Sequence, residues 1–300
     1  MRHADTMKLG FVGFVYQPPQ TITDQIERIK WQTAKVNELG GSVFHQGGMP
    51  LLPDDQGKLD ELKAHIDSVG VELELGCPYI FGLTGNESAK TRADLAKQIK
   101  KAQFLGIKIM RAGYGKMNVV SSRYNKDYPL KEHIDFVVKN LIEAGKIFED
   151  AGIHFALENH CDFLGSEFVD IFTRVNSKFV GCALDTANGF AVFNDANKEV
   201  EELAPFAFTT HIKDMVILDN DPASGFVPLQ AWGCPLGEGN VDIPRALEIL
   251  DSKSPMASGL HLIVEQSWMK FDDRITDRDL YAKESIHKSM KYLKKLLGRT

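Results

Sequence analysis

Several features are scarce or missing in this chain of 300 residues, and each absence narrows the classes of protein to consider. The four cysteines are far apart and form no Cys-x-x-Cys pair, which argues against a disulfide scaffold or a zinc knuckle. Excess positive charge is absent, because the formal net charge is -6, so we expect no nucleic-acid partner. No apolar run approaches the ~20 residues that a membrane span needs, so we expect no membrane partner either. These absences favour a small-molecule partner.

The cysteines and the N-terminal residues indicate in which cellular compartment we expect the protein. Widely scattered cysteines predict reduced thiols in a cytoplasmic protein. Met1 to Thr6 carries charge but no apolar core of a signal peptide. We therefore expect residues 1–7 to be a flexible leader or a start-site extension. The oligomeric state is left open, a homo-oligomer included.

Short apolar runs alternate with segments of helical period along the whole chain. Several helical segments are followed by glycine directly before the next apolar run, as at Gly70, Gly106 and Gly152. This alternation predicts a (β/α)8 TIM barrel forming one α/β domain over residues 1–300. A doubly wound sheet is the alternative, although no Gly-x-Gly-x-x-Gly follows the first run as a dinucleotide-binding fold would need. The expected strands begin at Leu9 and cover 42–45, 71–75, 107–111, 153–158, 180–185, 206–212 and 259–265.

Two local predictions can be compared directly with a structure. The helix expected over Thr21–Leu39 has Thr21 or Thr23 as its N-cap. The segment Met215–Val241 has four glycines, three prolines and no helical period, so we expect a long loop above the pocket.

Four of the apolar runs end in side chains that bind metals. Glu158, Asp185, His211 and Glu265 close the fifth to eighth expected strands. In a barrel the carboxyl ends of the strands carry the active site, so these residues should meet at the mouth. Three converging carboxylates need protons, basic side chains or a cation to offset their repulsion. An oxygen-rich set with one imidazole suits Mn²⁺ first, with Mg²⁺, Co²⁺ or Zn²⁺ as alternatives. The plainer interpretation pairs each acid with a nearby Lys or Arg.

The same stretches resemble a known family. Ala-Leu-Glu-Asn-His, Ala-Leu-Asp-Thr-Ala-Asn, Thr-His-Ile-Lys-Asp, Leu-Gly-Glu-Gly-Asn-Val-Asp and Val-Glu-Gln stand in this order from residue 156 to residue 266. The order and spacing are similar to those of the xylose isomerase-like TIM barrels, the group of sugar isomerases and epimerases that includes ketose 3-epimerases, inosose dehydratases and family 2 AP endonucleases. The resemblance covers most of the chain from Met7. It implies that the four strand-end residues bind one divalent cation.

The resemblance also implies a reaction. A sugar or keto-polyol would be deprotonated beside its carbonyl to an enediolate, with Glu158 and Glu265 as the proton-transfer pair. Transfer on two faces gives epimerisation, and transfer on one face gives isomerisation or, in a lyase, dehydration. A barrel that binds a carbohydrate or a second subunit without catalysis is the alternative from another class. An AP endonuclease is disfavoured, because the histidines do not supply its further ligands and the chain is acidic.

Two departures from the ketose 3-epimerases concern the substrate. Those enzymes carry a His three residues after the Asp of strand six and an Arg some six residues after the His of strand seven. Here Asn188 and Ile217 occupy these places. We expect Asn188 to contact substrate, and a substrate different from that of the 3-epimerases.

Further substrate-contacting residues are proposed from their positions at strand ends. His160 follows Glu158 by two residues, and Lys213 follows His211 by two, so each shares a side with a ligand if its strand continues. Arg111 and His45 end two other strands and suit a hydroxyl or carboxylate, although salt bridges or caps would explain them as well. An apolar wall for a sugar face is expected from Trp232, Trp268, Phe14 and Tyr16.

Overall fold

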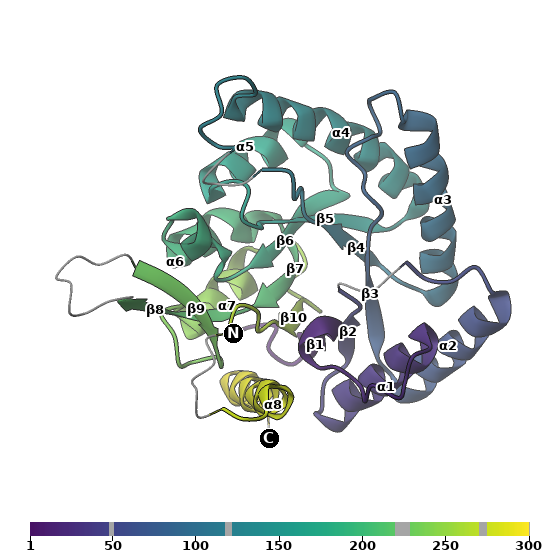
Figure 1. Ribbon diagram of the computed structural model, residues 1–300, viewed down its shortest axis with the longest axis vertical. Coiled ribbons are helices and arrows are strands. Elements are labelled where there is room, and N and C mark those ends of the chain that lie inside the picture. The colour runs from purple at the N-terminus through teal and green to yellow at the C-terminus, as the bar shows by residue number, and fades with distance from the viewer. Residues whose placement is uncertain (48–50, 118–121, 220–228, 270–274, 300) are drawn as a thin grey trace.

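The computed structural model describes residues 1–47, 51–117, 122–219, 229–269 and 275–299, and within them the chain forms a closed parallel barrel (Figure 1). The strand order is β1-β10-β7-β6-β5-β4-β3-β2, so neighbours in the chain are neighbours in the ring except for the separate pair β8-β9. The predicted TIM barrel is confirmed. The barrel strands are β1 Lys8–Val12, β2 Val43–His45, β3 Glu72–Gly76, β4 Ile109–Ala112, β5 His154–Glu158, β6 Val180–Asp185, β7 Ala207–Ile212 and β10 His261–Val264.

Helices surround this ring and bury one apolar stripe each against it. In α1, for example, Ile26, Ile29 and Val36 are buried at helical spacing. The helix α2 ends at Gly70 with φ 64°, a left-handed conformation that costs glycine little. The helices are α1 Gln25–Glu38, α2 Gln56–Val69, α3 Ser88–Leu105, α4 Leu130–Ala151, α5 Gly165–Val175, α6 Ala196–Leu203, α7 Ile243–Lys253 and α8 Arg278–Leu296, with the short 3-10 helices η1 Gly13–Val15, η2 Asn188–Val192 and η3 Ala204–Phe206.

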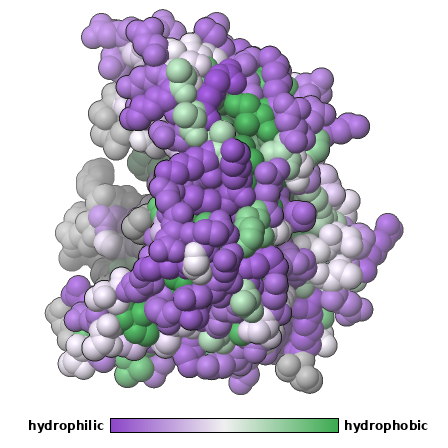
Figure 2. Space-filling view, turned by 90° about the vertical axis from the view of Figure 1, so that its right-hand side faces the viewer, coloured by the Kyte–Doolittle hydropathy of each residue, from purple (hydrophilic) through white to green (hydrophobic). Residues whose placement is uncertain are grey.

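On one side of the molecule the surface of the helical layer is mostly hydrophilic. Figure 2 shows the side of the molecule that lies to the right in Figure 1, where small apolar patches are interrupted by polar side chains. The four cysteines all lie within the described residues and are free thiols.

Two local predictions were wrong. The N-cap of α1 is Asp24, whose carboxylate accepts hydrogen bonds from the backbone N–H groups of Ile26 and Glu27, in place of Thr21 or Thr23. The expected loop Met215–Val241 instead contains most of an antiparallel hairpin, β8 Asp214–Asp219 and β9 Leu229–Cys234, which projects from the barrel in Figure 1. The glycines and prolines of the whole segment obscured the apolar run of β8, whose backbone groups find partners in β9.

Asp214 joins the base of this hairpin to the chain that follows it. Its carboxylate accepts hydrogen bonds from the backbone N–H groups of Gly237, Gly239 and Val241 at 2.9, 3.0 and 3.1 Å. A Cβ atom on Gly239 would lie 2.2 Å from the Asp214 carboxylate, so this position has no room for a side chain.

The N-terminal residues pack against the end of the barrel where the strands begin, opposite their carboxyl ends. Met7 is buried, and the backbone N–H groups of Arg2 and His3 donate to Asp251. The two chain ends lie side by side, since Arg299 donates to the backbone carbonyl of Met7 at 2.7 Å.

The middle of the barrel is polar. Glu74 is 0% exposed, and its Oε1 accepts from the Thr209 hydroxyl and lies 2.6 Å from Nδ1 of His261. Its Oε2 lies 3.6 Å from the Arg111 guanidinium. A small separate apolar cluster is contributed by the four neighbouring strands β4 to β7, with one residue from each: Ile109, Ala156, Ala183 and Phe208. The carboxylate of Glu74 is therefore flanked by Arg111 on one side and by His261 on the other.

The ion pair of Glu74 and His261 should make the free energy of unfolding decrease at alkaline pH. Burial by itself lowers the pKa of His261, but hydrogen bonds to Glu72 and Glu74 raise it to about 9. Because this pKa is raised on folding, the stabilisation is complete below the ordinary value near 6.5 and is lost as the pH rises through about 9. We expect His261→Gln to cost about 3 kcal/mol at pH 6.5 and much less at pH 10, measured by urea unfolding.

His65→Gln is the matched control for this measurement. Burial lowers the pKa of His65, the direction opposite to that of His261, so the effect of its loss should not decline as the pH rises through about 9. A cost of His261→Gln that did not change with pH would contradict the charged pair.

Candidate metal centre and active site

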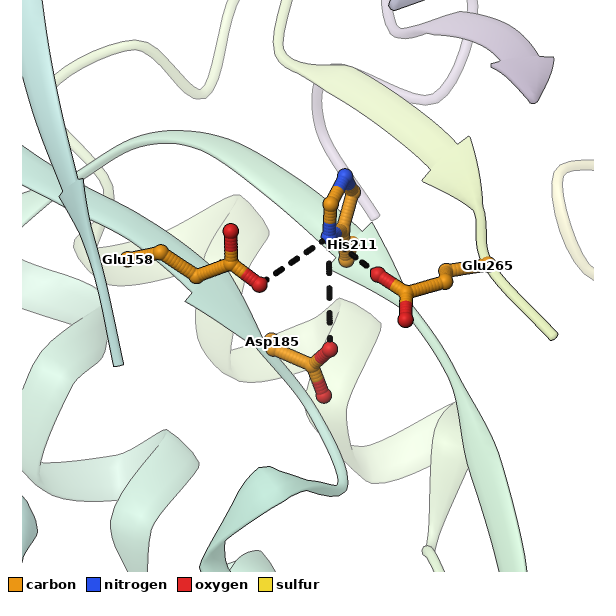
Figure 3. Close-up of side chains that lie close together, drawn as sticks. All are labelled: Glu158, Asp185, His211 and Glu265. Atoms are coloured by element: carbon orange, nitrogen blue, oxygen red, sulfur yellow. Dashed lines mark ion pairs between the residues drawn. The ribbon is translucent and has the colours of Figure 1, made fainter. Parts of the chain in front are cut away.

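The four strand-end residues Glu158, Asp185, His211 and Glu265 meet at the mouth of the barrel (Figure 3). Each offers one ligand atom, and these atoms all lie within 4.8 Å of one another. Nδ1 of His211 is 3.4 Å from Glu158, 4.0 Å from Asp185 and 2.5 Å from Glu265. Side chains two positions apart along a strand face the same side of the sheet. Glu158 therefore faces the inside of the barrel, as Ala156 two residues before it does.

A second histidine orients His211. Nδ1 of His45 lies 3.0 Å from Nε2 of His211, which leaves Nδ1 of His211 directed at the carboxylates. Burial, with Arg111 and His211 nearby, holds the pKa of His45 well below its ordinary value, so its ring is neutral. Burial and Arg111 by themselves lower the pKa of His211, but Glu265 and Glu158 raise it to about 9. In the cation-free protein His211 is therefore protonated.

Asp185 is held by backbone groups on one side only. Its Oδ1 accepts from the N–H groups of Ala187 and Asn188, at 2.8 and 3.0 Å, as the chain turns into η2. Asn159, directly after β5, fixes the backbone of Asp185, donating to its carbonyl at 2.9 Å and accepting from its N–H at 2.6 Å. The other oxygen, Oδ2, is buried and has no hydrogen-bond partner within the described parts of the chain. Burial raises the pKa of Asp185, although Lys213 opposes this.

Lys213 is a buried cation beside the cluster. Its Nζ donates to Asn188 at 2.9 Å and to Glu265 at 3.2 Å, and it lies 3.6 Å from Oδ2 of Asp185. The ammonium also stands 3.8 Å from the centre of the Trp268 ring. Burial by itself raises the pKa of Glu265, but Lys213 and His211 hold it well below its ordinary value. Lys213 thus keeps Glu265 ionised.

Arg111 has the corresponding position beside Glu158. Its guanidinium is buried, 3.4 Å from Glu158, and its three nitrogens make no hydrogen bond within the described residues. Burial by itself raises the pKa of Glu158, but His211 and Arg111 lower it to about 2. Both glutamates at the mouth are therefore carboxylates.

The donor set fits a hard divalent cation. Three carboxylates and one imidazole converge in a space from which water is largely excluded, and Oδ2 of Asp185 has no hydrogen-bond partner in the described residues. Buried polar atoms without partners are rare in proteins, and a cation bound among the four residues would satisfy this oxygen. The mixture of oxygen ligands with one nitrogen suits Mn²⁺, Mg²⁺, Co²⁺ or Zn²⁺.

Of the other residues proposed from the sequence, some contact the four-residue cluster and others do not. Asn188, Lys213, Arg111 and His45 all lie in contact with the cluster, as described above. His160 is exposed and is linked to it through Trp268, with the two ring centres 6.0 Å apart. Trp232 lies in the hairpin strand β9 opposite Val216.

Sequence reasoning missed two polar groups at this site. Ser267 donates to Oε1 of Glu265 at 2.6 Å, and Asn159 clamps Asp185. Both stand next to motif residues, Ser267 two positions after Glu265 and Asn159 directly after Glu158, so proximity in the sequence was the available signal.

Comparison with known proteins identifies the family of this barrel. A family model described as xylose isomerase-like TIM barrel matches residues 33–296. No curated protein sequence matches. Within the described residues no helix is long and apolar enough to cross a membrane.

Solved structures share the fold over nearly the whole chain. A xylose isomerase-like TIM barrel protein from Mycobacterium smegmatis in complex with magnesium has a TM-score of 0.70 at 18% identity, covering 99% of this chain and 98% of that one. D-psicose 3-epimerase with D-tagatose from Clostridium cellulolyticum H10 has 0.68 at 17%, covering 97% and 99%. The IolI protein with a zinc atom has 0.64 at 18%, covering 97% and 98%. With the family model extending over most of its length, the chain belongs to the xylose isomerase-like TIM barrel family.

Proposed function

We propose that the protein is a divalent-metal-dependent isomerase or epimerase of a sugar or keto-polyol. The cluster at the barrel mouth supports this proposal, and so does the likeness to a D-psicose 3-epimerase crystallised with a ketose. The proposed ligands are Glu158, Asp185, His211 and Glu265, and the proposed acid/base pair is Glu158 and Glu265.

The observation that carries the proposal is the placement of the two glutamates. Glu158 and Glu265 approach Nδ1 of His211 from opposite sides, at 3.4 and 2.5 Å (Figure 3). Both are ionised, so either can accept a proton from carbon. A substrate between them would present its two faces to different carboxylates, which is the arrangement that inversion of a carbon centre needs.

The residues around the pair have separate tasks. When bound, a divalent cation supplies a Lewis acid to substrate oxygens. Arg111 keeps Glu158 ionised, and Lys213 does the same for Glu265 while offering donors to a substrate oxygen. Asn188 accepts from Lys213 and so fixes the direction of its ammonium. We favour Mn²⁺ on the donor set, with Mg²⁺ and Zn²⁺ supported by the metals in two structural neighbours and Co²⁺ by the same donors.

A lyase is the second candidate. Elimination begins with the same removal of a proton but also needs a donor to a departing hydroxyl group. The buried ammonium of Lys213, 3.2 Å from Glu265, favours this alternative. The two reactions differ in their products, since only elimination forms a dehydrated sugar.

Exchange of substrate hydrogen with solvent tests the proton transfer. We expect the Mn²⁺-loaded protein to exchange the hydrogen beside the carbonyl of a ketose or inosose in deuterated water, followed by NMR. Glu158→Gln and Glu265→Gln should each lower the exchange rate by about 10²–10⁴-fold, because the amide cannot accept the proton.

Glu143→Gln is the control, since Glu143 is a surface residue paired with Arg92 and Lys146. Its exchange rate should match that of the unaltered protein. Full exchange by both active-site variants would contradict the assigned roles.

Metal binding can be tested without any substrate. A cation that binds only the folded protein at about 100 times its Kd adds about 2.7 kcal/mol of stability. We expect Mn²⁺ to raise the Tm of the chelator-treated protein by several degrees, and Asp185→Asn to abolish most of that rise.

Asp251→Asn provides the comparison for this measurement, because Asp251 is a buried carboxylate that binds the N-terminal backbone instead. This variant should keep the full Mn²⁺-dependent rise in Tm. An equal rise in the Asp185→Asn variant would show that the cation binds elsewhere.

A further inference from the structure

Glu199, in α6, is a carboxylate buried between two neutral amides. It is 2% exposed. Its Oε1 accepts a hydrogen bond from the side-chain NH2 group of Asn159 at 2.8 Å, and its Oε2 accepts one from that of Asn194 at 3.1 Å. Burial raises the pKa of Glu199 to about 7, although these two hydrogen bonds oppose the rise. Burying a carboxylate costs free energy, and this cost is offset only if both oxygens find donors.

The two amides are oriented so that both present donors to Glu199. The side-chain oxygen of Asn159 accepts from the N–H of Asp185 at 2.6 Å, and that of Asn194 accepts from the N–H of Asp195 at 3.0 Å. The NH2 group of each amide is therefore the part that faces Glu199. A carboxylate can accept from both groups, whereas a glutamine would set its own NH2 group against one of them. The two neighbours thus require an acid at position 199.

Asn159 links this contact to a proposed metal ligand. Its NH2 group donates to Glu199 and also to the carbonyl of Asp185 at 2.9 Å, so both of its hydrogens are used. With the bond from the N–H of Asp185, the backbone of this residue is held at two atoms. Its Oδ2 points toward His211 and lies 4.0 Å from Nδ1 of that ring (Figure 3). The direction of Oδ2 therefore depends on a backbone that Asn159 holds in place.

The packing around Glu199 leaves little freedom to its side chain. A Cβ atom on Gly189 of η2 would lie 2.6 Å from Oε2 of Glu199, and one on Gly165 of α5 would lie 2.9 Å from its Cγ. Glycine at both positions makes room for this close approach. The start of α5, the helix η2 and the residue after β5 thus all contact one side chain of α6.

We propose that Glu199 is a positioning residue of the metal centre, which acts through Asn159 on the backbone of Asp185. Groups that hold metal ligands from behind set their orientation, and losing one typically weakens metal affinity by about 10–100-fold. The inference rests on the proposed metal-dependent function. It adds a residue from α6 to the four that converge at the barrel mouth.

The affinity for Mn²⁺ measures this role without a substrate. The chelator-treated protein is titrated with Mn²⁺ in a calorimeter at pH 8, where Glu199 is mostly ionised. Glu199→Met keeps the length of the side chain but removes both acceptors, so Asn159 is no longer held from behind. We expect this variant to raise the Kd for Mn²⁺ at least about tenfold. An unchanged Kd would overturn the proposal.

Asp162→Asn is the control for the loss of a buried carboxylate. Asp162 is 1% exposed, and burial raises its pKa as it does that of Glu199. Its carboxylate accepts from the backbone N–H groups of Gly115 and Met117 instead, which belong to the loop after β4. This variant should change the Kd for Mn²⁺ by less than about threefold, because it leaves Asn159 and Asp185 in place.

An exchange of acid and amide separates positioning from a general effect on folding. Glu199→Gln sets a donor against a donor, and Asn194→Asp sets a carboxylate against a carboxylate, so each should weaken Mn²⁺ binding. In the double variant Glu199→Gln/Asn194→Asp, the new amide can accept from Asn159 and donate to the new carboxylate. We expect it to bind Mn²⁺ more tightly than either single variant, whereas independent damage would add. A double variant weaker than both would contradict the positioning role.

Hydrogen exchange tests the same contact with no metal present. The N–H of Asp185 donates to Asn159, so Glu199→Met should speed exchange of this amide by about tenfold in NMR, and Asp162→Asn should not. Unchanged exchange at Asp185 would overturn the inference and leave the proposed function standing. If the unaltered protein bound no Mn²⁺, the proposed function would fail, while faster exchange would still show that Glu199 holds the backbone of Asp185.

Discussion

The repulsion among three carboxylates at one end of the barrel is the constraint on which the rest of the site depends. Glu158, Asp185 and Glu265 each bring a negative charge into a volume with little water, and such charges are stable only with compensation. The chain supplies Arg111 on one side and Lys213 on the other, and neither lies among the four converging residues. The space among the four residues fits a divalent cation, while the buried side chains of Arg111 and Lys213 keep the two glutamates ionised.

The polar middle of the barrel follows from the same constraint. Arg111 can stand beside Glu158 only if its own burial is compensated, and Glu74 provides a carboxylate on its other side. Glu74 in turn is neutralised by His261. A column of alternating charges thus replaces part of the apolar layers that usually fill such barrels.

Much of the fold and the four converging residues could be predicted from the sequence, for reasons that are local. Each βα unit begins with an apolar run, and glycine with positive φ ends several helices, so the strands could be located one by one. The closure of the ring then brings the strand ends together without any further information. The hairpin β8-β9 was missed because its two strands are short runs separated by a segment that contains glycine and proline, and neither run indicates by itself that it pairs with the other. Contacts such as Glu74 with His261 join residues far apart in the chain, and neither residue carries a local sign of the other.

The carboxylate of Asp214 has a consequence for how this chain tolerates changes in the hairpin. It holds both the start of β8 and the chain after β9, so the hairpin leaves and returns to the barrel at one fixed point directly after Lys213. We therefore expect changes in the length of the projecting arm to leave His211 in place, because loop length costs little once the ends are held. Asp214 and Gly239 thus hold the base of the hairpin fixed relative to the strand that carries His211.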